Sequence, residues 1–262
     1  MSSVVSVAPA CTAPKRSASL ALAAVVLAAL ALVSPAWAQH EVELESANNN
    51  VANTASLQRG AKYFVNYCLG CHSAQYVRYN RLAQDLQLTE DQLVNNLMFT
   101  GEQPHDTMAI AMRPADSERW FGRTPPDLSL IARARGTDYI YTFLRSFYAD
   151  PTSPTGADNL VLPNTAMPHV LWPLQGIRRA VFTTDEEHGG QPVFERFEVV
   201  RPGELSEHEF DQVVRDIVNF LDYIGEPMQR ERQALGIRVI AFLLMFLLIA
   251  YMLKREIWKD VT

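Results

Sequence analysis

Cysteine and positive charge are both scarce in this sequence. Three cysteines in 262 residues are too few for a disulfide framework. The 23 Lys and Arg residues are outnumbered by 29 Asp and Glu, which gives a formal net charge of -6. Phosphate binding needs a basic face, so we expect no nucleic-acid partner. Hydrophobic residues make up 48% and charged residues 20% of the chain, which argues against a disordered or fibrous protein.

The N-terminus has the pattern of a secretory signal. Lys15 and Arg16 precede an apolar run at residues 20–33, which is too short for a comfortable bilayer span. Ala36-Trp37-Ala38 then fits an A-x-A cleavage site. We therefore predict that residues 1–38 are a signal peptide. An uncleaved N-terminal anchor is the alternative.

A second apolar run, at residues 235–253, contains a single charge, Arg238. A helix of this length rises about 28 Å, enough to cross a hydrocarbon core of about 30 Å. We predict a transmembrane anchor at residues 233–254 and a cytoplasmic tail at 255–262. Basic residues flank the run on both sides, so the predicted signal peptide decides the orientation and places residues 39–232 outside the cytoplasm. A buried core helix is the alternative.

Between these ends the sequence predicts a mainly α domain with long loops and little sheet. Thr89 with Gln92, and Ser206 with Glu209, have the spacing of capping boxes that open helices. Alternating apolar residues on both sides of Gly189 indicate a β-hairpin. The predicted order is a loose lead-in at 39–55, helices at 57–69 and 89–99, a loop at 100–127, a helix at 138–148, a loop at 149–176, the hairpin at 181–200 and a helix at 206–225.

The sharpest motif is Cys68-Leu69-Gly70-Cys71-His72. This C-x-x-C-H pattern is typical of covalent haem attachment. Two cysteines three residues apart can form thioethers to one porphyrin, and the adjacent histidine then lies under the iron. A thioredoxin-like motif would need a βαβ context that is missing here, and a zinc site would need two further ligands. A plain disulfide is the remaining alternative.

The second axial ligand decides what such a haem can do. A methionine thioether would raise the reduction potential and suit electron transfer, whereas an open position would suit an enzyme or sensor. Spacing favours Met167, in the Pro-bracketed segment 163–168 far downstream of His72. The alternatives are Met98, Met108, Met112, His105 and His169.

Four segments together resemble the cytochrome c1 family. They are C-L-G-C-H-S at residues 68–73, P-P-D-L-S at 125–129, I-A-R-A-R-G at 131–136 and A-M-P-H-V-L at 166–171, followed by an anchor and the basic tail. The resemblance runs in order from about residue 40 to the end, and it is strongest to the proteobacterial members. Some members contain an additional cysteine pair. This chain lacks that pair once the signal is removed, so packing must hold the loop at 100–127 or the loop at 149–166.

The resemblance implies a class I-like cytochrome c domain with one covalent haem c and its iron. His72 and Met167 would be the axial ligands, Cys68 and Cys71 the thioether residues, and Pro125 and Pro126 would lie against the haem. Arg135 would contact a haem propionate, and Tyr139 would lie in the same pocket. A family member would be an electron carrier on its own and part of an enzyme only within ubiquinol–cytochrome c oxidoreductase.

The resemblance also implies partners and a location. The chain would accept an electron from a Rieske iron–sulfur protein, pass it to a soluble cytochrome c and assemble with cytochrome b in a dimeric respiratory-chain complex. It would be a single-pass protein of the bacterial inner membrane, with its haem domain on the periplasmic side. The alternatives are donation of electrons to a terminal oxidase, or an open-site haem enzyme or sensor.

The acidic balance is concentrated in residues 185–211, which could steer a basic redox partner or form an ordinary solvated face. The nine acidic residues there are Asp185, Glu186, Glu187, Glu195, Glu198, Glu204, Glu207, Glu209 and Asp211.

Overall fold

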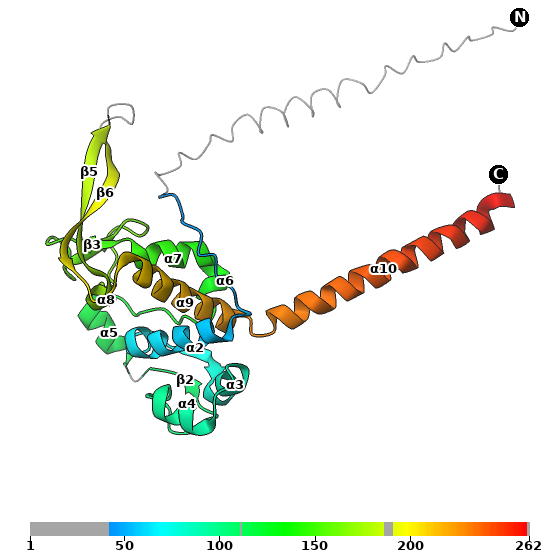
Figure 1. Cartoon of the computed structure of the whole chain (residues 1–262), viewed down its shortest axis with the longest axis horizontal. Coiled ribbons are helices and arrows are strands. Elements are labelled where there is room, and N and C mark those ends of the chain that lie inside the picture. The colour runs from blue at the N-terminus through cyan, green and yellow to red at the C-terminus, as the bar shows by residue number, and fades with distance from the viewer. Residues whose placement is uncertain (1–41, 111, 186–190, 261–262) are drawn as a thin grey trace, which may run out of the picture. The chain divides into compact units, whose positions relative to one another are not determined.

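The computed structural model describes residues 42–110, 112–185 and 191–260. This part of the chain is mainly helical, with three two-stranded antiparallel sheets (Figure 1), which confirms the predicted fold class. The helices are α2 (Thr54–Tyr63), η1 (Phe64–Cys68), α3 (Tyr79–Asp85), α4 (Glu90–Asn96), α5 (Pro114–Phe121), α6 (Ile131–Arg135), α7 (Thr137–Arg145), α8 (Trp172–Gln175), α9 (Glu207–Gly225), α10 (Gln229–Ile257) and η3 (Trp258–Asp260). The strands are β1 (Ala74–Arg78), β2 (Thr107–Met108), β3 (Phe147–Ala149), β4 (Ala157–Asn159), β5 (Gly176–Asp185) and β6 (Gln191–Pro202).

The core forms where α2 packs against α9. Gly60 permits this close approach, since a Cβ at that position would lie 2.1 Å from the Asp216 carbonyl oxygen. Asp216 is 3% exposed, and its carboxylate accepts hydrogen bonds from Ser56 Oγ (2.6 Å) and from Arg59 Nε and Nη2 (2.6 and 2.9 Å). A buried carboxylate is tolerated because these donors replace water. The pair α2 and α9 is therefore joined by apolar packing and one satisfied polar cluster.

Both predicted capping boxes are present. The Thr89 and Ser206 hydroxyls accept from the backbone N–H groups of Gln92 and Glu209, whose side chains accept from the cap backbone in return. The helix expected at 57–69 begins earlier, at Thr54, and its last turn is a π-helix that ends on Cys68. The helix expected at 138–148 ends at Arg145, because Phe147 begins strand β3.

The two regions predicted as loops contain regular structure. Residues 100–127 include β2 and α5, which begins with Pro114 and ends before Gly122 at φ 72°. Proline at the first helical position and glycine after the last one are helix signals. Helix α5 was nevertheless not predicted, because apolar residues are sparse in this segment and show no helical period. Residues 149–176 include β4 and the single turn α8.

The predicted hairpin forms and is longer than expected. Strands β5 and β6 pair from Gly176 opposite Pro202 to Asp185 opposite Gln191, with register shifts after Ile177 and Val181. The turn predicted around His188-Gly189-Gly190 lies outside the described residues. So do the predicted signal peptide at 1–38 and the last two residues of the tail.

The final long helix, α10, includes the segment predicted as an anchor. Its stretch Glu231–Ile257 is 27 residues long and apolar enough to cross a membrane, and none of its most apolar window is buried. A core helix would bury this surface, so the fully exposed apolar face favours a membrane helix.

Candidate functional site

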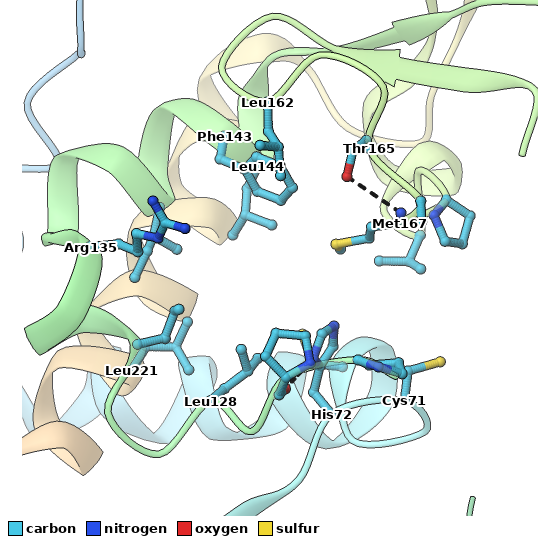
Figure 2. A pocket seen from close by; sticks show the side chains of 18 of the residues that line it. Cys71, His72, Leu128, Arg135, Phe143, Leu144, Leu162, Thr165, Met167 and Leu221 are labelled. Atoms are coloured by element: carbon cyan, nitrogen blue, oxygen red, sulfur yellow. Dashed lines mark hydrogen bonds between the residues drawn. The ribbon is translucent and has the colours of Figure 1, made fainter. Parts of the chain in front are cut away.

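A cavity of about 320 Å³ is lined by residues of η1, α5, α6, α7 and α9 and of three loop segments, which lie at 71–72, 123–128 and 162–170. Figure 2 shows two facing walls, with Cys71, His72, Leu128 and Leu221 on one side and Phe143, Leu144, Leu162, Thr165 and Met167 on the other. All eight residues predicted from the sequence line this cavity: Cys68, Cys71, His72, Pro125, Pro126, Arg135, Tyr139 and Met167. The fold thus brings together residues that are up to about a hundred positions apart.

The first wall begins with the turn that follows the π-helix. The backbone N–H groups of Cys71 and His72 both donate to the Cys68 carbonyl, at 3.0 and 2.8 Å. This turn places two thiols and one imidazole beside one another on the cavity. Neither cysteine is in a disulfide. Burial raises the pKa of the Cys68 thiol to about 12 and also raises that of Cys71, so both sulfurs are neutral thiols.

The imidazole of His72 is oriented by its second nitrogen. Its Nδ1 lies 2.7 Å from the carbonyl oxygen of Pro126, which can only accept a hydrogen bond. Nδ1 therefore carries the proton, and Nε2 keeps its lone pair for a metal. Burial lowers the pKa of His72, against a smaller opposing effect of the hydrogen bond to Pro126, and so favours the neutral ligand form.

The P-P-D-L-S segment is hydrogen-bonded to the residues that directly follow the C-x-x-C-H motif, Ser73 and strand β1. The N–H of Leu128 donates to the Ser73 carbonyl (2.8 Å), and Asp127 accepts from the N–H of Gln75 (2.9 Å). Asp127 also accepts from the Ser129 N–H at 2.8 Å. These contacts hold the Pro126 carbonyl where His72 needs it. They give a physical reason for this motif to accompany C-x-x-C-H.

The opposite wall is a loop organised by side chains. Asn159, which is fully buried, accepts from the N–H groups of Val161 (2.9 Å) and Leu162 (3.2 Å) and donates to the Phe143 carbonyl (2.8 Å). Asp158 accepts from the N–H of Thr165 at 3.2 Å. Loops without regular hydrogen bonds need such partners when they are buried. These side-chain hydrogen bonds hold the loop that leads to Met167.

Met167 extends from this loop into the cavity (Figure 2), and its backbone N–H donates to Thr165 Oγ1 at 3.4 Å. The alternative ligands lie elsewhere. Met108 is fully buried in β2, and neither it nor Met98, Met112, His105 or His169 lines the cavity. Among the candidates the sequence left open, Met167 has its thioether across the cavity from His72.

Arg135 and Tyr139 lie together at one end of the cavity wall, with the guanidinium 5.4 Å from the ring centroid. Arg135 has no carboxylate partner among the described residues, which leaves its charge available to an anionic group. The sequence did not single out a second cavity arginine, Arg123. The helical spacing of Ile140 with Leu144 and of Ile217 with Leu221 predicts a buried face on each helix, but the sequence did not assign these residues to the cavity.

The donor set fits a haem group and not the simpler alternatives. The described residues contain no group of three or more His, Cys, Asp or Glu side chains arranged to hold a metal ion, so the zinc alternative lacks its ligands. An imidazole with an available Nε2 faces a thioether across apolar walls, and two thiols line the cavity beside it. The Arg135 guanidinium, which has no carboxylate partner among the described residues, also lines the cavity. Fold and site together define the class: a c-type haem protein with a membrane-type helix.

Comparison with known families makes the class specific. The model of the cytochrome C1 family matches residues 46–261, so the chain belongs to the cytochrome c1 family. Proteins of this family carry covalently bound haem c with iron and serve electron transfer in respiratory chains. The family assignment from the four sequence segments is thereby confirmed.

Three relatives illustrate the range of similarity. A cytochrome c1 of Allochromatium vinosum is 50% identical over 236 residues, covering 90% of this chain and 96% of its own. A protein of Nitrosomonas europaea named ammonia monooxygenase gamma subunit is 44% identical, covering 84% of this chain and 90% of its own. A cytochrome b/c1 of Bradyrhizobium diazoefficiens is 24% identical, covering 78% of this chain and 33% of its own.

Proposed function

We propose that this chain accepts one electron from a Rieske iron–sulfur protein and passes it to a soluble cytochrome c within a quinol–cytochrome c reductase. The observation that carries this proposal is the pairing of Met167 with His72 across one apolar cavity. An iron held between imidazole and thioether has no open position for a substrate and cycles between Fe(II) and Fe(III). The site therefore supports electron transfer better than a haem enzyme or sensor.

The predicted cavity residues would then share the work of holding the haem. Cys68 and Cys71 would form thioethers to it, and His72 and Met167 would ligate its iron. Pro126 orients His72 through its carbonyl and, with Pro125, would contact the haem. Arg135 would pair with a propionate, and Tyr139 supports the Arg135 guanidinium from one side. The neighbouring apolar side chains exclude water and thereby help to set the reduction potential.

Membership of a cytochrome b-containing complex is supported by the names of relatives. One similar protein is called cytochrome b/c1, and one from Candida albicans is a cytochrome b-c1 complex catalytic subunit. We infer that this chain assembles with cytochrome b and the Rieske protein in a dimeric complex. Residues 1–38 would direct export and residues 233–254 would anchor the domain in the bacterial inner membrane, with the haem on the periplasmic side.

The acidic segment 185–211 is a candidate docking face, but several of its charges are already engaged. Glu195 and Glu198 form ion pairs with Arg196, and Asp211 forms one with Arg145. Glu209 caps α9 through Ser206. Glu204 and Glu207 are exposed members of the segment.

We expect the rate of cytochrome c reduction to fall with rising ionic strength. The double variant Glu204→Lys with Glu207→Lys should reduce cytochrome c more slowly at low salt. A rate unaffected by both changes would contradict the docking proposal.

The decisive experiment is purification of the haem protein from membranes. Co-purification with cytochrome b and a Rieske subunit, together with quinol-dependent reduction of cytochrome c, is the expected result. Association with a terminal oxidase in place of these subunits would favour the alternative electron route. A haem spectrum without methionine ligation would favour an open site.

A further inference from the structure

The haem cavity is lined by two permanent positive charges and by no carboxylate. Arg123 and Arg135 line it, and no Asp or Glu of the described residues does so. Arg135 lies at the end of the cavity away from Cys71 (Figure 2) and has a proposed role toward a propionate. Arg123 has no such role so far. A fixed charge beside a redox centre shifts the balance between its oxidised and reduced states.

Arg123 differs from the two other arginines of its segment. Arg113, which precedes α5, and Arg119, within α5, form ion pairs with the Asp116 carboxylate at 2.8 and 3.0 Å. Neither of them lines the cavity. Arg123 is exposed, and among the described residues it has no ion pair, hydrogen bond or ring contact. Its charge is therefore the one in this segment that the chain does not neutralise.

The backbone around Arg123 is held on both sides. Upstream, helix α5 ends at Gly122, whose φ of 72° lies in the left-handed region and turns the chain. Phe121 and Arg123, on either side of this glycine, both line the cavity. Downstream, the carbonyl oxygen of Pro126 lies 2.7 Å from Nδ1 of His72. The position of Arg123 is thus tied to that of the imidazole.

This tether places the charge within electrostatic reach of the metal-binding nitrogen of His72. Three residues of chain separate Arg123 from Pro126, so their Cα atoms are at most about 11 Å apart. For a separation on the order of 12 Å between the guanidinium and the iron site, Coulomb's law gives about a twofold effect on an equilibrium in water and about a tenfold effect at an effective dielectric constant of about 20. The apolar cavity walls favour the larger value, and the exposure of Arg123 favours the smaller one.

We propose that Arg123 raises the reduction potential of the haem through its unneutralised charge. Reduction removes one positive charge from the iron, so a nearby cation stabilises the reduced state relative to the oxidised state. This role differs from that of Arg135, because it requires a charge at this place and no direct bond to the haem. It rests on the proposed electron-transfer function, in which the haem lies between His72 and Met167.

Redox titration of the complex purified from membranes tests the proposal. Arg123→Gln removes the charge and keeps a long polar side chain. We expect the equilibrium constant for haem reduction to fall about twofold to tenfold, which is about 18–59 mV at about 59 mV for each tenfold change. Arg123→Lys keeps the charge and should retain most of the potential. The difference between the parent and Arg123→Gln should shrink at high ionic strength, since salt screens an exposed charge.

Arg119→Gln is the matched control. It removes a charge from the same segment that is paired with Asp116 and lies outside the cavity, so the potential should stay at the parent value. An unchanged potential in Arg123→Gln overturns the proposal. An equal fall in Arg123→Lys or in Arg119→Gln also overturns it, because the effect would then depend on neither the charge nor its place.

The ferric charge-transfer band that reports methionine ligation is recorded for the parent and every variant. Its absence from the parent would contradict the pairing of His72 with Met167, and with it the proposed function. The role of Arg123 is decided separately, by the difference in potential between Arg123→Gln and Arg123→Lys.

Discussion

The two walls of the haem cavity are built in opposite ways. On the His72 wall, the bonded residues of segments 68–75 and 125–129 lie more than fifty positions apart in the sequence, and they are joined by the hydrogen bond of His72 to the Pro126 carbonyl and by hydrogen bonds of Ser73 and Gln75 with the second segment. On the Met167 wall, a loop between β4 and α8 is held by the side chains of Asn159 and Asp158, whose bonds lie within residues 143–165. The first wall also carries both cysteines, and the second carries none. We therefore predict that loss of the two proposed axial ligands has different consequences.

Changes to the cysteines of the His72 wall should abolish covalent haem attachment. We expect the double variant Cys68→Ala with Cys71→Ala to lose covalent haem entirely, because no other described cysteine can form a thioether. Each single variant should retain one attachment point. The measurement is haem-associated peroxidase staining of membrane proteins after denaturing electrophoresis. Covalent haem in the double variant would show that the two thiols are not the attachment sites.

Loss of Met167 should lower the reduction potential of the haem and leave its covalent attachment intact. Met167→Leu conserves volume and removes the thioether. We expect covalent haem to remain, the ferric methionine band to disappear and the reduction potential to fall by at least about 60 mV, a tenfold shift in a one-electron equilibrium. Met98→Leu is the matched control, since Met98 lies outside the cavity. The measurement is a redox titration of the complex. An unchanged reduction potential in Met167→Leu would mean that one of the other candidates is the second ligand.

This contrast also explains what the sequence could predict. On the His72 wall, Cys68, Cys71 and His72 were assigned from the local spacing of C-x-x-C-H. Pro125 and Pro126 were assigned only through the family resemblance, and the apolar residues of this wall were not assigned to the site. Met167 was favoured on spacing alone and became specific only through the family resemblance. Asn159 and Asp158 were not recognised as loop-organising residues, because an isolated polar side chain carries no periodic signal. Helix α5 was missed for a related reason: its Pro and Gly boundaries were present, but its apolar pattern was weak.

Substitution of one buried polar residue in each region, Asn159 near Met167 and Asp216 between α2 and α9, tests whether the two regions unfold independently. Asn159→Ala removes the acceptor of two loop N–H groups, and Asp216→Ala removes the carboxylate that joins α2 to α9. Each should cost about 2–3 kcal/mol, allowing for the partial exposure of Arg59. In a denaturant titration, Asn159→Ala should lose the methionine band before helical circular dichroism, whereas Asp216→Ala should lose both together. The same order in both variants would mean that the two walls are not independent.

Titration of His169 gives the smallest expected effect. Burial, with a further contribution from the Arg178 charge, lowers the pKa of His169 to about 4 from an ordinary value near 6.5. Between pH 6.5 and about 4, the unfolded chain therefore binds a proton at His169 that the folded chain does not bind. The stabilising contribution is present in full above pH ~6.5 and is lost as the pH falls toward about 4, at a cost of about 2 kcal/mol near pH 4.5. The measurement is the free energy of unfolding of the detergent-solubilised chain across this range.

The loss should be specific to this side chain, because His169→Phe removes the titrating group and keeps the aromatic stack on Phe147. The variant's free energy of unfolding should therefore fall less steeply between pH 6.5 and 4.5 than the parent's, even if it is lower at neutral pH. His208→Phe, which removes an exposed histidine, should retain the full slope. Equal slopes in the parent and His169→Phe would place the acid sensitivity elsewhere.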